Sequence, residues 1–231
     1  MKIDLSACKY YFLTCENEKR RTHFWNEFAG LDITEVHPIV GIGRIPSGIT
    51  GFSRMLDKAV CDQPVGQPFR PFVLMEDDVK KYREFPDSVV VPDDADFLYV
   101  GISSFGMNDF SHCHDVFYKG IDNDVVRVFN MLSLHGIMVC SLRGVLILQK
   151  CLMESRFTDL IWDIYTARMQ PFVNAYALRV PLVYQFGELG GQEGPTKIEF
   201  SSPDRANIPP GWIHRQHFSF LTCHPDCSSS L

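Results

Sequence analysis

The chain has 231 residues, of which 45% are hydrophobic and 22% are charged, a globular composition that can bury one sizeable core. Its net charge is −6 and it has no run of five basic residues, which argues against nucleic acid as a partner. It has neither a signal-peptide pattern nor an apolar window near the roughly 20 residues of a membrane span.

Eight cysteines are present, but a chain of this length and apolar content does not need disulfides to fold. Cys140 and Cys151 lie in apolar stretches, where a thiol usually acts as a small hydrophobic group. We therefore expect a soluble cytoplasmic protein made in a reducing compartment.

Predicted strands and helices alternate along the chain. Strands are expected at 9–14, 33–42, 71–75, 96–101, 125–129 (an edge strand), 136–140 (a central strand), 173–178 and 182–185. Helices are expected at 23–28, 52–60, 143–153 and 158–169, with loops at 61–69 and 105–115. This order predicts an α/β fold with a mixed, mostly parallel central sheet flanked by helices. Residues 1–190 would form one domain, and 191–231 a C-terminal extension that is packed on it or partly ordered.

Three consecutive acids, Glu76, Asp77 and Asp78, follow the apolar run 71–75. Ligands of open α/β sheets bind at the carboxyl ends of the strands. Adjacent carboxylates repel one another by a few kcal/mol per close pair at an effective dielectric constant of about 20, and a divalent cation with oxygen ligands offsets that repulsion. The triplet therefore predicts a metal site that joins the protein to a nucleotide diphosphate.

The same acids also allow a structural interpretation, in which Asp77 or Asp78 caps a helix over 79–82. Their position directly after a wholly apolar strand favours the metal site.

The segment Phe72–Val79, FVLMEDDV, resembles the hEDD signature of glycosyltransferase family 25 and related GT-A enzymes. Further segments resemble that family in the same order: 46–54, 95–101, 135–141, and 158–160 followed by 176–178 and 181–185. The resemblance covers about residues 8–190. Within 46–54 the chain departs from the family, because Ile49 or Thr50 stands where the family has Glu and Arg54 stands where it has His.

This resemblance implies a GT-A fold and a metal-dependent transfer of sugar from a nucleoside diphosphate, expected to be UDP, to a glycan or glycoprotein hydroxyl. It implies that Asp78 binds Mn²⁺ or Mg²⁺, that Glu76 contacts ribose or metal-bound water, and that Asp77 belongs to the donor site. Thr14 and Arg21 would lie near the base and the phosphates.

Basic residues near the predicted helix starts are candidates for phosphate contacts. A cation at a helix start, such as Arg21, needs a compensating anion. For Arg20 we expect a solvated position. Arg54 and Lys58 lie four residues apart on one helix face, where they either reach phosphate or are solvated.

An inverting transfer needs a general base for the acceptor hydroxyl. Asp159 occupies the family position of such an acid, and Asp163 lies one helical turn later with Trp162, a candidate sugar platform, between them. Alternatively, Asp159 follows Thr158 in capping the helix.

The histidines are less specific. His112 and His114 lack a second Cys/His pair at zinc spacing, and His135 precedes a strand and is expected to line the pocket. GT-A enzymes often use a late histidine for metal, but the pattern does not choose among His214, His217 and His224.

Two other functions remain open from the residues. A sugar nucleotidyltransferase normally has a glycine-rich, lysine-bearing loop after its first strand, which 14–17 lacks. A catalytically inactive GT-A-like carbohydrate-binding domain is disfavoured by the acids at 76–78 and 159.

Overall fold

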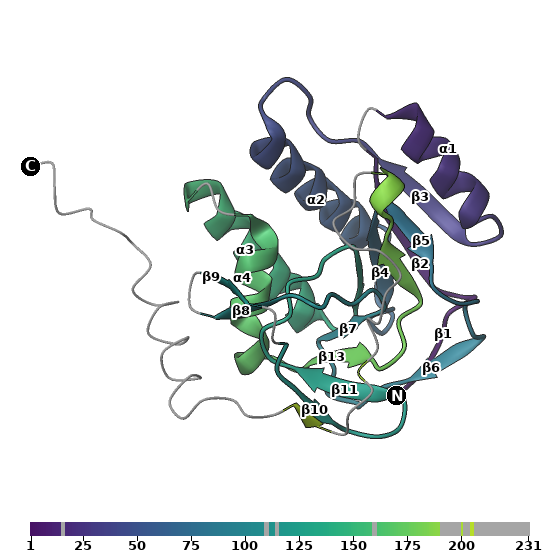
Figure 1. Ribbon diagram of the computed structural model, residues 1–231. Coiled ribbons are helices and arrows are strands. Elements are labelled where there is room, and N and C mark those ends of the chain that lie inside the picture. Colours follow the sequence, from purple (N-terminus) through teal and green to yellow (C-terminus); the bar gives the residue numbers. More distant parts are fainter. Residues whose placement is uncertain are drawn as a thin grey trace, which may run out of the picture.

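Figure 1 shows a computed structural model of the chain, which describes residues 1–14, 17–108, 111–113, 116–158, 161–189, 200 and 204–205. Its strands are β1 Lys2–Asp4, β2 Lys9–Leu13, β3 Asp32–Val36, β4 Phe72–Glu76, β5 Val79–Lys81, β6 Ser88–Val90, β7 Phe97–Tyr99, β8 Gly106–Asn108, β9 Ser111–Cys113, β10 Tyr118–Gly120, β11 Val125–Val128, β12 Gly136–Val139, β13 Ala175–Leu178, β14 Val183–Gln185 and β15 Asp204–Arg205. Its helices are α1 Glu18–Glu27, α2 Arg44–Cys61, α3 Leu142–Thr158 and α4 Trp162–Met169, with short 3₁₀ turns η1 Gln170–Phe172 and η2 Gly187–Leu189.

The described strands form a mixed sheet in the order β15-β10-β11-β13-β7-β12-β4-β2-β3. Strands β3, β2, β4, β7, β13 and β10 run in one direction, and β12, β11 and β15 run the other way. The prediction of a mixed sheet flanked by helices is confirmed. The expected "mostly parallel" sheet is correct in that most strands point in one direction. Most neighbouring pairs are nevertheless antiparallel, because β11 and β12, which point the other way, lie between strands of the first set.

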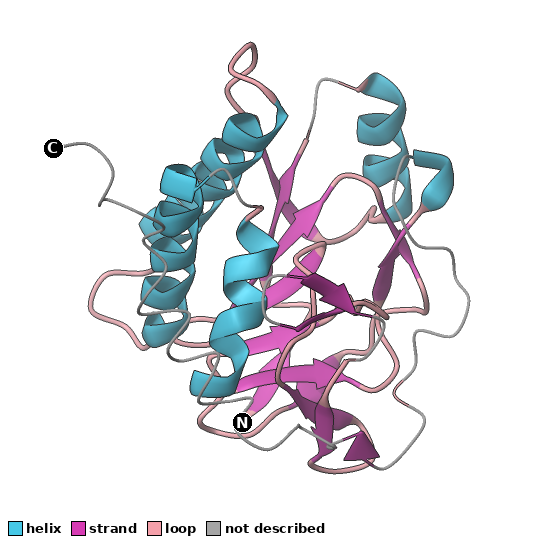
Figure 2. Ribbon diagram, turned by 60° about the vertical axis from the view of Figure 1, so that its left-hand side comes forward, coloured by secondary structure: helices cyan, strands magenta, loops and turns pink. Residues whose placement is uncertain are grey.

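Both faces of this sheet are buried, as the apolar runs predict. Alternate residues such as Tyr11, Leu74 and Ile137 pack with α2 and α3, whereas Tyr10, Val73 and Met138 pack on the side of α1. The sheet thus separates α1 from the longer helices (Figure 2). Cys140, in the core on the side of α1, and Cys151 of α3 are buried free thiols, as expected.

Several predicted elements differ from the structure. Strand 125–129 is not an edge strand, because β11 lies between β10 and β13. Strand β14 pairs with β5 in a separate two-stranded sheet rather than completing the large one. The described part of the expected loop 105–115 contains the paired strands β8 and β9.

Helix α2 begins at Arg44, eight residues before the predicted start. Pro46 lies in its first turn, where a missing N–H costs nothing because those N–H groups have no partner within the helix. Glycines 48 and 51 made this segment resemble a loop. Ile49, Phe52 and Leu56 nevertheless follow the helical period and are buried.

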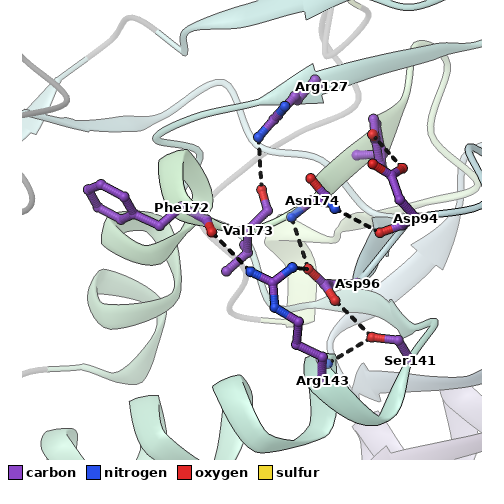
Figure 3. A network of polar contacts seen from close by, with 10 residues as sticks. Asp94, Asp96, Arg127, Ser141, Arg143, Phe172, Val173 and Asn174 are labelled. Atoms are coloured by element: carbon purple, nitrogen blue, oxygen red, sulfur yellow. Dashed lines mark hydrogen bonds and ion pairs between the residues drawn. The ribbon is translucent and has the colours of Figure 1, made fainter.

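A polar network around Asp96 joins the starts of β7, α3 and β13 (Figure 3). The buried Asp96 carboxylate accepts hydrogen bonds from Ser141 Oγ at 2.8 Å, Arg143 Nη1 at 3.1 Å and the Asn174 backbone N–H at 3.0 Å. Ser141 Oγ also accepts the Gly144 N–H at 2.9 Å and so caps α3. The network holds the start of α3 and the segment that leads into β13 beside the start of β7.

Of the expected extension 191–231, the structure describes Phe200 and β15. Phe200 packs on Tyr118 with 4.4 Å between ring centroids, and β15 pairs with β10. The remaining residues, including His214, His217 and His224, lie outside the described part of the chain. No described helix combines the length and hydropathy needed to cross a membrane.

Candidate functional site

A cleft of about 780 Å³ lies at one edge of the large sheet, within the ~300–1,000 Å³ range of small-molecule sites. The strand register creates it. Leu13 of β2 lies beside Glu76 of β4, and Met75 lies opposite Gly136 of β12. Thr14 and Asp77 therefore leave the sheet at the same edge where His135 enters it, and all three line the cleft.

Glu76 is the last residue of β4, and Asp77 and Asp78 form the tight connection to β5, because Val79–Lys81 is a strand and not a helix. The helix-cap interpretation of Asp77 and Asp78 is therefore wrong. The Phe186 N–H, directly after β14, donates to the Asp78 carbonyl at 2.7 Å. The β5–β14 pair thus holds the backbone of the triplet in the cleft.

Arg20 of α1 is the nearest countercharge. Its Nη1 lies 3.1 Å from Asp77 Oδ1 and 3.8 Å from Asp78 Oδ2, with only 21% of its side chain exposed. The expectation of a solvated Arg20 is wrong. The helix face at 18–21 projects one of its two arginines toward the acids.

Glu76, the last residue of β4, has a strongly perturbed environment. Burial raises its pKa well above the ordinary value, and the neighbouring carboxylates of Asp78, Asp163 and Asp77 raise it further. Gln185 Nε2 donates a hydrogen bond to Glu76 Oε2 at 3.2 Å and opposes this effect. Burial likewise raises the pKa of Asp78 to about 6, although Arg20 acts in the opposite direction.

The Asp78 carboxylate is buried in the cleft with part of its hydrogen-bonding capacity unused. Asp78 is only 7% exposed, and its Oδ1 is buried without a donor among the described residues. A buried polar atom of this kind costs roughly 1–3 kcal/mol, and more when charged. Such an atom calls for a ligand that supplies positive charge.

The residues that line the cleft carry an excess of negative charge. Among the described ones, Glu76, Asp77, Asp78 and Asp163 face two arginines, Arg20 and the exposed Arg44. Arg44 is the first residue of α2, and its neighbours Gly43, Ile45, Ser47 and Gly48 also line the cleft. Arg20 thus lies directly on the acids of the triplet, and Arg44 adds a second positive charge at the N-terminus of α2, which also favours anions.

Trp162 and Asp163 enter the cleft from the first turn of α4. The Trp162 ring packs on Phe52 with 5.3 Å between centroids. It also lies against Gly48, where an added Cβ would come within 2.2 Å of the indole. Gly48 is thus required for the close approach of α4 to α2. Asp159, the expected general base, lies outside the described residues.

The other predicted basic residues do not line the cleft. Arg21 donates from Nε to Glu35 Oε1 at 2.7 Å, so its compensating anion is a protein carboxylate. Arg54 donates to the His37 carbonyl at 3.2 Å, and Lys58 pairs with Asp62 at 2.5 Å. Thr14 does line the cleft, where its backbone N–H donates to Val36.

Sequence reasoning missed Arg20, Arg44 and Gln185 as residues of the cleft. Arg20 could have been found, because adjacent residues of a helix lie on different faces. On a helix that begins at Glu18, Arg20 therefore does not share the solvated face of Arg21. Arg44 had none once the start of α2 was placed at residue 52. Gln185 depends on the pairing of β14 with β5, which a one-dimensional pattern does not reveal.

Glu76 and Asp78 fit a hard divalent cation only if the ligand completes its coordination. No three His, Cys, Asp or Glu side chains in the described ranges are grouped to hold a metal ion. Mg²⁺ sites in nucleotide enzymes commonly use one or two carboxylates, with water and phosphate supplying the other oxygens. The buried Asp78 oxygen suits that arrangement, whereas a cation held by protein alone does not fit.

No protein-family model matches this chain, and no curated protein sequence matches it significantly.

Proposed function

We propose that the chain is a glycosyltransferase that moves a sugar from a nucleoside diphosphate, expected to be UDP, to a hydroxyl group of a glycan or glycoprotein. The observation that carries this proposal is the partnerless, buried Asp78 oxygen in an acidic cleft of about 780 Å³. The segment resemblance to glycosyltransferase family 25 supports the same function, and so do the two arginines that line the cleft, Arg20 and Arg44.

In this proposal Glu76 and Asp78 hold Mn²⁺ or Mg²⁺ together with the diphosphate. The cation supplies charge neutralisation for the departing diphosphate when it is bound. Arg44 and Arg20 supply positive charge for the phosphates, and the N-terminus of α2 favours the same anions. Trp162 offers a flat apolar surface to a sugar ring.

The acceptor hydroxyl attacks the anomeric carbon, the bond from that carbon to the diphosphate oxygen breaks, and a carboxylate takes the hydroxyl proton. Asp163, in the first turn of α4, lines the cleft and lies close enough to Glu76 to raise the pKa of Glu76. Asp159 keeps its expected role as base from the resemblance. The proposed outcome is inversion at the anomeric carbon.

A donor-turnover assay tests this proposal. The wild-type chain should release UDP from one or more members of a UDP-sugar panel in the presence of Mn²⁺, and EDTA should abolish that release. Asp78→Asn, which keeps the shape but removes the charge, should lower turnover by at least about 100-fold if several kcal/mol of stabilisation depend on the cation. No release with any nucleotide sugar, or release unaffected by EDTA and Asp78→Asn, would contradict the proposal.

The two general-base candidates are tested in the same assay. Asp159→Asn and Asp163→Asn should differ, because only the residue that takes the proton contributes the typical ~10²–10⁴-fold of general-base catalysis. If both variants keep full transfer to an acceptor, neither carboxylate is the base.

A further inference from the structure

His135 is the second buried side chain of the cleft that has an unused polar atom. It is 2% exposed and lines the cleft, and its Nε2 has no hydrogen-bond partner among the described residues. A partnerless nitrogen at this depth costs free energy unless a ligand satisfies it.

The neighbours of His135 determine which nitrogen carries the proton. The Ser133 hydroxyl donates its single hydrogen to the Gly101 carbonyl at 3.0 Å. Ser133 Oγ also lies 3.3 Å from His135 Nδ1, and with its own hydrogen engaged it can only accept there. Nδ1 is therefore the protonated nitrogen of a neutral imidazole, and Nε2 bears the free lone pair.

The neutral state of the ring agrees with its surroundings. Burial lowers the pKa of His135 to about 4. Gly101 packs directly on the ring, since a Cβ there would lie 2.5 Å from Cδ2. The ring is thus wedged in one orientation with its acceptor fixed.

Because His135 Nε2 accepts a hydrogen bond, it can bind only a ligand group that donates one. A fully ionised diphosphate has no hydrogen to donate, so Nε2 matches an O–H or N–H group. The backbone N–H of Glu76 donates to the His135 carbonyl, which places His135 on the Glu76 side of the triplet, whereas Arg20 contacts Asp77 and Asp78. The guanidinium groups suit the phosphates, and the hydroxyl groups of the sugar are the donors that suit Nε2.

We propose that His135 is a specificity residue whose Nε2 accepts a hydrogen bond from a hydroxyl group of the donor sugar. This inference rests on the proposed function of the cleft. It assigns to His135 a role in sugar recognition and no role in holding the metal.

Two amide substitutions separate the two ring nitrogens. The amide of His135→Asn reaches the position of Nδ1 and keeps the bond to Ser133, but it has no atom at Nε2. The longer amide of His135→Gln places an oxygen acceptor near Nε2. Asn should therefore lose the sugar contact, and Gln should restore part of it.

Calorimetry with Mn²⁺ present should show the same UDP affinity for wild type, His135→Asn and His135→Gln. With a UDP-sugar that the wild type binds, His135→Asn should weaken affinity about 3- to 10-fold, the effect of one neutral hydrogen bond, and His135→Gln should bind more tightly than Asn. Equal UDP-sugar affinity in all three proteins would overturn the proposal. So would a matching loss for UDP alone, which would place the contact on the nucleotide, or a loss of affinity for Mn²⁺ alone.

A measurement on the wild-type protein tests the proposal even if the variants do not fold. Long-range ¹H–¹⁵N NMR should show His135 as the Nδ1–H tautomer, with the Nε2 resonance shifting on addition of the UDP-sugar but not of UDP. An Nε2–H tautomer, or no shift with the UDP-sugar, would contradict the proposal. If the wild-type chain binds no nucleotide at all, the proposed function is wrong and this inference is wrong with it. If the wild type binds nucleotide but the His135 variants keep the same UDP-sugar affinity, only this inference is wrong.

Discussion

Arg20 and Arg21 are adjacent in sequence but have different surroundings. Arg20 pairs with the buried Asp77 and Asp78, whereas Arg21 pairs with Glu35 and has 44% of its side chain exposed. Ion pairs at exposed positions typically contribute about 0–1 kcal/mol. Removing one partner of a buried pair costs about 3–5 kcal/mol.

We predict that Arg20→Ala lowers the free energy of unfolding by about 2–3 kcal/mol, less than for a fully buried pair because Arg20 is partly exposed. The matched control Arg21→Ala should lower it by less than about 1 kcal/mol. Urea denaturation of the two variants measures both values. Equal losses would show that Arg20 is not the countercharge of the triplet.

His135 makes stability depend on pH. Its folded pKa of about 4 lies below the ordinary value of 6.5, so the unfolded chain takes up the proton first as the pH falls. This contribution to stability is complete above about pH 6.5 and is lost as the pH falls toward 4, by at most about 3 kcal/mol.

The difference in unfolding free energy between wild type and His135→Asn should therefore change between pH 7 and pH 4.5, with the wild type losing more. Denaturation at several pH values, with EDTA present, makes the comparison. A constant difference for His135→Asn would mean that the imidazole already titrates normally in the fold.

At the scale of elements, the contact between α2 and α4 sets the cleft wall. Helix propensity alone predicts that Gly48→Ala stabilises α2 by about 1 kcal/mol. The indole of Trp162, which would lie 2.2 Å from the new Cβ, predicts the reverse. We expect a net loss of about 1–3 kcal/mol from overpacking, together with a changed Trp162 environment.

Thermal unfolding and tryptophan fluorescence of Gly48→Ala check this prediction. Asp57→Ala, at an exposed position of the same helix, should stay within about 0.5 kcal/mol of wild type. A stabilised Gly48→Ala protein would show that α4 does not pack on α2 at this point.

The Asp96 network should be structural and independent of the cleft. Asp96→Ala leaves the Ser141 hydroxyl and the Asn174 N–H without their acceptor, and we expect a loss of about 2–4 kcal/mol. Asp94→Ala, which among the described residues removes one hydrogen bond, from the Tyr176 hydroxyl at 3.0 Å, should cost about 1 kcal/mol. Denaturation measures both values. Nucleotide affinity should be unchanged in the folded fraction, and altered affinity would contradict the separation of the two sites.

Some elements could be predicted from sequence because their signals are local. The apolar run before Glu76 and the segment Gly136–Val139 fall in β4 and β12, at the centre of the sheet, as their burial on both faces predicts. The start of α2 could not be predicted, because glycines 48 and 51 are there for close packing and resemble turn residues. Strand β5 is too short to show a period, so its pairing with β14 became visible only in three dimensions.

At the scale of the whole molecule, the sheet determines which residues meet. Because β12 runs against β4, His135 at its start lies beside the triplet at the end of β4. The rule that ligands bind at strand carboxyl ends predicted Glu76, Asp77 and Asp78. It does not consider the start of an antiparallel strand, which is where His135 lies. Arg20 and Arg44 depend on how α1 and α2 pack against that edge, which no local pattern encodes.

The central claim is that the triplet binds a nucleoside diphosphate through a shared cation, and calorimetry with UDP and GDP, with and without Mn²⁺, tests it most directly. The wild type should bind Mn²⁺ alone only weakly, because Glu76 and Asp78 are too few ligands. It should bind UDP tightly only when Mn²⁺ is present, and Asp78→Asn should lose that dependence. Tight binding of Mn²⁺ without nucleotide, or nucleotide binding that is the same with and without Mn²⁺ or in Asp78→Asn, would contradict the account.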